Sequence, residues 1–239
     1  MSSKTALPVA LLVVVFLMAW PTVKLLAQNT CPGCSEPAKV VHPNGFGPQS
    51  YARWQPKTGL ADSAGTTGDF SMLLVHLTPA TITATARAVV AIEGFDSRLV
   101  GPASGQVTNL AFWVRTTDPM GMPTGECTLT SPRFSIRWRL SPMPDQFSEA
   151  RCANVAEMGL FGTTATAVNG FTYEKRTVSW VFTGQAFATI PPGAIIISLA
   201  ILYDDLLQPS SHIDDIEVTD TTNGCPPCIW TRPADNGSN

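Results

Sequence analysis

The chain has 239 residues, of which 14% are charged, and its formal net charge is −3 at pH 7. The charged share is well below the usual value of about 25%, and no run of Lys or Arg offers the basic surface that nucleic-acid binding requires, so we expect no nucleic acid as a partner. The 18 Gly and 20 Pro residues favour strands and turns over helices, and the length is ample for one sizeable core.

The first 27 residues predict export. Lys4 supplies a short basic start, an uncharged apolar run follows at 5–23, and Leu-Leu-Ala at 25–27 offers a cleavage site. This layout is typical of a secretory signal. The alternative is a retained anchor, because residues 5–23 are long enough to cross a bilayer and would then form the membrane contact. With either, we expect the rest of the chain to be extracytoplasmic: secreted, periplasmic or at the cell surface.

Four regions are expected along the chain. They are the signal or anchor at 1–27, an irregular lead-in with CPGC at 28–68, a β-sandwich at 69–220, and a CPPC-containing tail at 221–239. The lead-in stretches HPNGFGPQS and DSAGTTGD are rich in turn-forming residues, so we expect this region to pack over the sandwich without strands. No internal repeat is found, and the length that remains after the signal favours a single domain.

Alternating apolar and polar side chains predict strands in the middle of the chain. In RFSIRWRL (133–140), Phe134, Ile136 and Trp138 share one face, and arginines occupy the other. Further strands are predicted in FSMLLVHLT, NLAFWVRTT, RTVSWVFTG and HIDDIEVT. AIIISLAILY (194–203) is apolar on both faces, which is typical of a central strand covered on both sides. The fold class is therefore all-β, a two-sheet antiparallel β-sandwich.

The predicted core follows from the same alternation, since one face of each strand must be apolar. We expect buried side chains at Phe112, Phe134, Ile136, Trp138, Trp180, Phe182, Ile197 and Leu199.

Several short motifs resemble exported bacterial jelly-roll domains, most of them uncharacterised, whose outline is similar to carbohydrate-binding modules. The motifs are FWVRTTD, GECTLTSPRFSIRW and ARC, followed downstream by LYDD and HIDDIEV. In those domains a Cys-containing loop leads into a Ser-Pro-Arg-Phe strand, and an Asp-Asp-Ile segment forms the closing strand. The resemblance covers about residues 70–220 and implies a jelly-roll-like fold. It implies no function by itself.

Six cysteines in an exported chain predict three disulfides. Cys127 and Cys152 flank the arginine-rich strand, and we expect them to bond and close a loop of 25 residues. For a loop of that length, the chain-entropy relation gives a stabilisation of about 3.5 kcal/mol.

The other four cysteines are Cys31 and Cys34 in CPGC, and Cys225 and Cys228 in CPPC. Pro-Gly favours a type II turn, whereas Pro-Pro favours extended backbone that would hold Cys225 and Cys228 about 9 Å apart, too far for a local bond. We therefore expect disulfides that join the two segments. A four-cysteine zinc site and a redox pair remain alternatives, although the prolines remove backbone N–H groups and no helix follows either motif.

Catalytic motifs are not found. The histidines are His42, His76 and His212, and the sequence holds no Gly-x-Ser-x-Gly elbow, no His-Glu-x-x-His and no phosphate-binding glycine loop. His76 lies within an apolar strand, so we expect it to be packed. The chain is predicted not to be an enzyme.

Two pairs of carboxylates suggest a cation. They are Asp204-Asp205 and Asp214-Asp215, whose simplest interpretation is solvated strand ends. The resemblance to jelly rolls, which often hold structural calcium, implies a calcium site there, because this hard cation takes carboxylate and carbonyl oxygens. Apart from this calcium and the zinc alternative at the four terminal cysteines, no cofactor is expected.

A binding face is the second candidate site. If the strands at 107–117 and 132–140 are neighbours, their outward residues form one surface that could hold a sugar ring, an acidic glycan or an acidic protein. The residues are Trp113, Arg115, Arg133, Arg137 and Arg139. The alternative is that the arginines only solvate the sheet while Trp113 lies beneath the lead-in.

Two functions follow from these patterns. The first is a non-catalytic exported domain with a structural or protein-interaction role, as the extracytoplasmic subunit of a larger assembly. The second is a glycan-binding module that uses Trp113 and the arginine-bearing face.

Overall fold

The structure is a computed structural model that describes residues 40–47, 49–61, 69–77, 86–103, 105–159, 162–180, 184–222 and 227–231. The predicted signal or anchor and the CPGC motif lie outside these residues, so both stay predictions. No helix within the described ranges is long and apolar enough to cross a membrane.

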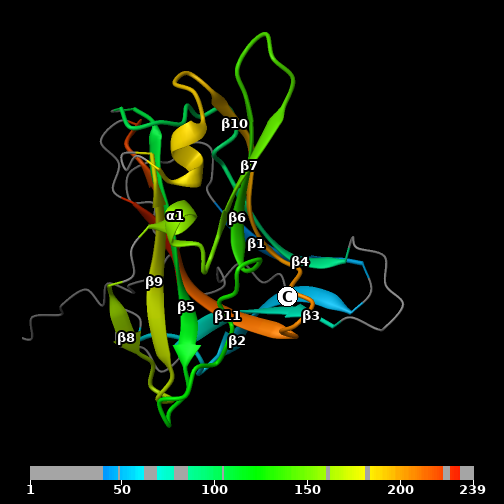
Figure 1. The fold of residues 1–239 in the computed structure, drawn as a ribbon, viewed down its shortest axis with the longest axis vertical. Helices are drawn as coiled ribbons and strands as arrows, with labels where there is room; N and C mark the ends of the chain where they lie inside the picture. The colour runs from blue at the N-terminus through cyan, green and yellow to red at the C-terminus, as the bar shows by residue number, and fades with distance from the viewer. Residues whose placement is uncertain are drawn as a thin grey trace, which may run out of the picture.

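Two antiparallel sheets pack face to face as an all-β sandwich, which confirms the predicted fold class (Figure 1). The five-stranded sheet has the order β1-β4-β10-β6-β7, formed by Val40–Phe46, Arg87–Glu93, Ile195–Tyr203, Arg133–Arg139 and Gln146–Arg151. The seven-stranded sheet has the order β2-β3-β11-β5-β9-β8, with β12 paired to β11. Its strands are Ser50–Pro56, Phe70–His76, Ser210–Asp220, Val107–Thr117, Thr172–Ser179, Thr164–Thr166 and Cys228–Trp230.

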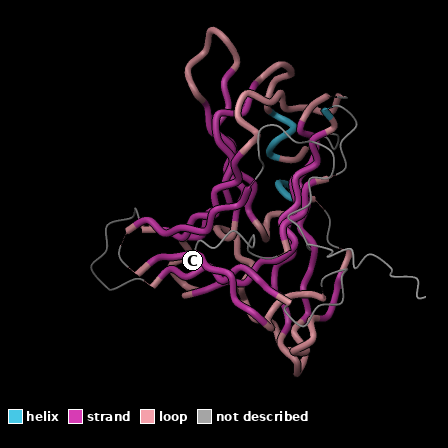
Figure 2. The backbone as a smooth tube through the Cα atoms, turned by 180° about the vertical axis from the view of Figure 1, so that it is seen from behind, coloured by secondary structure: helices cyan, strands magenta, loops and turns pink. Residues whose placement is uncertain are grey.

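Helix is confined to two short elements in the part of the chain described, as Figure 2 shows. They are α1 (Val155–Met158) and the 3-10 helix η1 (Ala186–Thr189). Both contact β7 and β9, which belong to different sheets, so they close one side of the sandwich. Asn154 caps α1 by accepting a hydrogen bond from the backbone N–H of Ala156.

The core lies between the sheets and largely matches the sequence prediction. Of the expected residues, Phe112, Phe134, Ile136, Trp138, Trp180 and Leu199 are buried, and Phe182 lies outside the described residues. Ile197 is only half-buried, and Ile196 takes its place in the core. The reason is a register shift in β10 opposite β6 between Ile196 and Ser198, which breaks the simple alternation.

Strand β10 is central, as predicted, but its cover is uneven. It is the middle strand of the five-stranded sheet, between β4 and β6. On its outward side Ile195 and Ile197 are half-buried and Ser198 is exposed. The expectation of full cover on both faces is therefore wrong for this outer surface.

The lead-in is not irregular, which corrects the predicted boundary at residue 68. Strand β1 pairs with β4 in one sheet and β2 pairs with β3 in the other, so this segment contributes an edge strand to each. Pro43 and Gly45 obscured β1 in the sequence. An edge strand tolerates proline because one of its sides needs no hydrogen-bonded partner.

The predicted tail also contributes to the fold. Strand β12 adds to β11, with Trp230 opposite Ile216, and both Cys228 and Trp230 are buried. The Trp230 ring meets Phe95 edge-on at 6.3 Å between centroids. The sandwich therefore continues past residue 220, where the sequence patterns placed its end.

Candidate functional site

The predicted five-residue binding face does not form. Trp113 and Arg115 lie on β5, whose neighbours are β11 and β9, whereas Arg133, Arg137 and Arg139 lie on β6, whose neighbours are β10 and β7. The chain changes sheets between β5 and β6, so the two strands are not adjacent. The prediction of a single surface with Trp113 beside all four arginines is wrong.

Trp113 lies beneath part of the lead-in. It is half-buried and packs on a second apolar cluster that includes Leu60 and Tyr173. The Leu60 backbone N–H donates to Asp214 Oδ2 at 2.6 Å, and the Tyr173 hydroxyl donates to the carbonyl of Thr58 at 2.7 Å. These contacts hold residues 57–61 over the seven-stranded sheet, so Trp113 is not an open stacking platform.

Arg115 belongs to a buried polar network. Its Nε donates to Glu126 Oε1 at 2.6 Å, and its guanidinium lies 4.3 Å from the Phe171 ring centroid. Glu126 Oε2 accepts the backbone N–H of His212 at 2.6 Å and lies 3.2 Å from its ring Nδ1. His212 Nε2 in turn lies 3.3 Å from Gln55 Oε1. The network links β2, β5, β11 and the loop after β5, and its burial favours a structural role.

Arg133 is held in an ion-pair network on the five-stranded sheet. Its Nη1 and Nη2 donate to the two oxygens of Asp204 at 2.5 and 2.8 Å, and its Nε lies 3.0 Å from Glu149 Oε2. Burial tends to raise the pKa of Asp204, but the hydrogen bond and charge of Arg133 and a hydrogen bond from Ser131 outweigh it, so the pKa of Asp204 lies below its usual value. This bidentate pair leaves Arg133 little capacity for a ligand.

Replacing Asp204 with asparagine is expected to destabilise the protein at pH 7 and not at low pH. A carboxylate with a lowered folded-state pKa stabilises the fold above its unfolded pKa, and that contribution is lost as the pH falls through the folded pKa. Because Asp204 is partly solvated, we expect the substitution to cost about 1–2 kcal/mol at pH 7. This cost should shrink as the pH falls below the usual carboxyl range and through the lowered pKa of Asp204. Urea denaturation across this pH range measures the difference.

The matched control for that experiment is Glu93→Gln at the exposed His42 pair, whose two atoms lie 3.5 Å apart. Because solvent screens this surface ion pair, the Glu93→Gln substitution should change the free energy of unfolding much less than Asp204→Asn does. If the stability difference between Asp204→Asn and the wild type did not shrink as the pH falls into the strongly acidic range, the role of the carboxylate would be contradicted.

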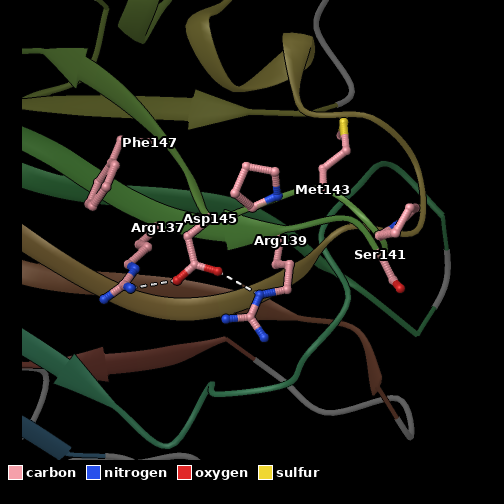
Figure 3. Close-up of a pocket in the computed structure, with 8 residues that line it drawn as sticks. Arg137, Arg139, Ser141, Met143, Asp145 and Phe147 are labelled. Atoms are coloured by element: carbon pink, nitrogen blue, oxygen red, sulfur yellow. Dashed lines mark hydrogen bonds and ion pairs between the residues drawn. The ribbon is translucent and has the colours of Figure 1, made fainter.

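Arg137 and Arg139 share one carboxylate. Asp145, just before β7, lies 2.5 Å from Arg137 Nη2 through Oδ2 and accepts a hydrogen bond from Arg139 Nε at 2.5 Å through Oδ1. The guanidinium of Arg137 also lies 5.8 Å from the ring centroid of Phe147. Figure 3 shows these side chains around a shallow pocket at the β6–β7 hairpin. The sequence prediction missed Asp145 and Phe147, which become neighbours of the arginines only when the hairpin pairs.

Three of the four predicted calcium ligands, Asp204, Asp205 and Asp214, are engaged with protein donors. Asp205 accepts hydrogen bonds from the hydroxyls of Thr128 and Thr130 and from the backbone N–H groups of Leu207 and Gln208. Asp204 binds Arg133, and Asp214 accepts the backbone N–H groups of Leu60 and Asp215. No group of three or more His, Cys, Asp or Glu suited to a metal occurs among the described residues. The geometry lends no support to a calcium site at these four aspartates.

The histidines lie in separate surroundings. His42 is an exposed partner of Glu93 on β1. His76 is buried with its Nδ1 2.9 Å from Ser50 Oγ, which confirms that it is packed. Because Ser50 and His76 are both buried, a substrate could not reach this pair.

The Cys127–Cys152 disulfide is confirmed, with a Cα–Cα distance of 5.4 Å. Cys228 is also disulfide-bonded, which favours a disulfide over a zinc ligand at that position. Cys31, Cys34 and Cys225 lie outside the described residues, so the expected bonds between the two ends of the chain stay a prediction.

Exposed leucines that the sequence analysis missed, here called the leucine cluster, lie on two loops, one of which follows Cys127 of this disulfide. We define it as Leu129, Leu206 and Leu207, which are 70%, 73% and 89% exposed. Leu129 lies between Thr128 and Thr130, and both threonines donate to the same oxygen of Asp205. Leu206 and Leu207 follow Asp205 directly, so this one carboxylate brings the two loops together.

Comparison with known proteins finds no family model, no curated protein and no solved structure that matches this chain. The function has to be argued from the geometry of these surfaces.

Proposed function

We propose that this chain is a non-catalytic, exported β-sandwich domain that binds another protein as the extracytoplasmic subunit of a larger assembly. The observation that carries the proposal is the leucine cluster. Soluble monomers rarely expose several large apolar side chains together, and such patches mark interaction sites. Three leucines at 70% exposure or more therefore favour a protein-binding surface.

The scaffold beneath the leucine cluster supports this role. Asp205 is 4% exposed and accepts four hydrogen bonds, which fix both loops. Burial tends to raise the pKa of Asp205, but these hydrogen bonds outweigh it and lower the pKa, so the carboxylate is ionised at neutral pH. Cys127 anchors the first loop covalently. Loops that are ordered before binding lose less conformational entropy when a partner docks.

The strand order supports the jelly-roll architecture that the resemblance implies. In chain order, β3, β5, β9 and β11 fall in one sheet as β3-β11-β5-β9, and the other sheet contains β4-β10-β6-β7. This is the order of two Greek keys wrapped into eight strands, as in a jelly roll. Jelly rolls serve many functions, so the choice of a partner rests on the surface.

Export and the absence of catalysis are the other parts of the proposal. The Cys127–Cys152 bond and the bonded Cys228 support an oxidising compartment. The non-catalytic assignment rests on the lack of catalytic motifs in the sequence. The alternative of a glycan module used Trp113 beside the arginines, and the separation of β5 from β6 removes that combined surface.

Site-directed photo-crosslinking tests the proposal. With p-benzoylphenylalanine in place of Leu207 in the full chain, made in its own host, we expect a light-dependent adduct of one defined mass. The adduct should disappear in a Leu129→Ser, Leu206→Ser background, while the unfolding midpoint stays near that of the wild type because exposed substitutions cost within about 0.5 kcal/mol.

Val168 is the matched control position, since it is 76% exposed in the turn between β8 and β9. Crosslinking there should give no such adduct. An identical adduct at both positions, or none at Leu207, would refute the proposed protein-binding surface.

A further inference from the structure

A second surface lies at the β6–β7 hairpin, which projects at one end of the molecule (Figure 1). A shallow pocket of about 650 Å³ opens there on the five-stranded sheet. Its lining combines charged, aromatic and proline side chains, shown in Figure 3: Arg137, Arg139, Ser141, Pro142, Met143, Pro144, Asp145 and Phe147.

The charges in this pocket are not balanced. Two guanidinium groups face the single carboxylate of Asp145, which takes Nη2 of Arg137 and Nε of Arg139. No other carboxylate among the described residues pairs with either arginine, and their side chains are 45% and 50% exposed. Arg133, by contrast, has two carboxylate partners. The pocket therefore carries a net positive charge with guanidinium N–H groups open to solvent.

An apolar surface adjoins these guanidinium groups. Phe147 is 68% exposed, and Met143 in the hairpin loop is exposed as well. Rigid aromatic rings beside arginines are typical of the residues that dominate protein–protein binding energy. Ser141 is the only neutral hydrogen-bonding side chain in the lining. A sugar has many hydroxyl groups, and this lining offers few neutral hydrogen-bonding partners for them. The lining therefore favours a peptide over a sugar.

We propose that the hairpin pocket binds an acidic segment of a partner protein, with a carboxylate on the guanidinium groups of Arg137 and Arg139 and an adjacent apolar side chain against Phe147. The inference rests on the proposed protein-binding function, but it uses a surface distinct from the leucine cluster. Charge-assisted hydrogen bonds from two guanidinium groups give both affinity and orientation.

Calorimetric titration of the full chain with two synthetic peptides tests the pocket. The probes are acetyl-Gly-Glu-Leu-Glu-Leu-Gly-amide and the same peptide with both glutamates replaced by glutamine. We expect the glutamate peptide to bind at least tenfold more tightly, and this preference to shrink with added salt. The double variant Arg137→Gln, Arg139→Gln should lose at least tenfold in affinity. Phe147→Ala should lose affinity and keep the salt dependence.

Arg53→Gln is the matched control, because Arg53 also lies over an aromatic ring, 5.4 Å from the centroid of Tyr51. It should bind the glutamate peptide as the wild type does. Equal binding of both peptides, undiminished binding by the double variant, or no binding at all would overturn the proposal. Tighter binding of polygalacturonate that depends on Arg137 and Arg139 would overturn it in favour of an acidic glycan. A negative result here with an intact Leu207 adduct refutes only the pocket, whereas loss of that adduct refutes the proposed function.

Discussion

Replacing Phe112 with alanine is expected to lower the free energy of unfolding by about 3–5 kcal/mol. Phe112 is fully buried on β5, and its ring centroid lies 5.0 Å from that of Phe134 on β6. Because β5 and β6 belong to opposite sheets, this pair joins the two layers at the centre of the core. Truncation removes a large apolar contact and leaves a cavity that the rigid sheets cannot close. Urea denaturation should show a lower midpoint with an unchanged m value.

Phe147→Ala is the control, since it deletes the same side chain from the exposed face of β7. We expect a change within about 0.5 kcal/mol. If Phe112→Ala cost as little, the core would not lie between β5 and β6 as the structure places it.

Removing the Cys127–Cys152 disulfide, by changing both cysteines to alanine, is expected to cost about 3.5 kcal/mol. The bond closes a loop with a sequence separation of 25 residues, and opening it increases the conformational entropy of the unfolded chain. The change should also weaken the Leu207 adduct, because Cys127 anchors the loop that presents Leu129. Thermal and urea unfolding measure the loss of stability. They are carried out without reductant, so that the disulfide at Cys228 stays intact.

The control for the disulfide is Leu206→Ser, which alters the neighbouring leucine cluster and should leave stability nearly unchanged. Peptide mapping without reduction should recover Cys127 and Cys152 as one linked species. A loss below about 1 kcal/mol in the double alanine variant would show that the unfolded chain is already compact around this loop.

The sequence by itself predicted the strands β3, β5, β6, β9, β10 and β11 and, outside the register shift of β10, the direction of most of their side chains. In β5, the inward set of Leu110, Phe112 and Val114 follows from alternation alone, because neighbouring side chains on a strand point to opposite faces. The Cys127–Cys152 bond was also predictable, since the two cysteines flank one predicted strand in a chain whose first residues predict export. The edge strand β1 escaped prediction, because Pro43 and Gly45 are compatible with an edge and mask its pattern.

Only the tertiary structure decided which strands are neighbours, and so which side chains meet. Alternation is a local property and does not say that β5 and β6 lie in different sheets, which is why the predicted face with Trp113 failed. The leucine cluster forms because Asp205 binds Thr128 and Thr130, 77 and 75 residues away. Arg137 meets Phe147 because the register of β6 and β7 places them opposite each other. These contacts depend on pairing between strands that are far apart in the sequence. A local pattern is compatible with several strand partners and registers, and the cost of loop closure together with the packing of the whole chain determines which one forms.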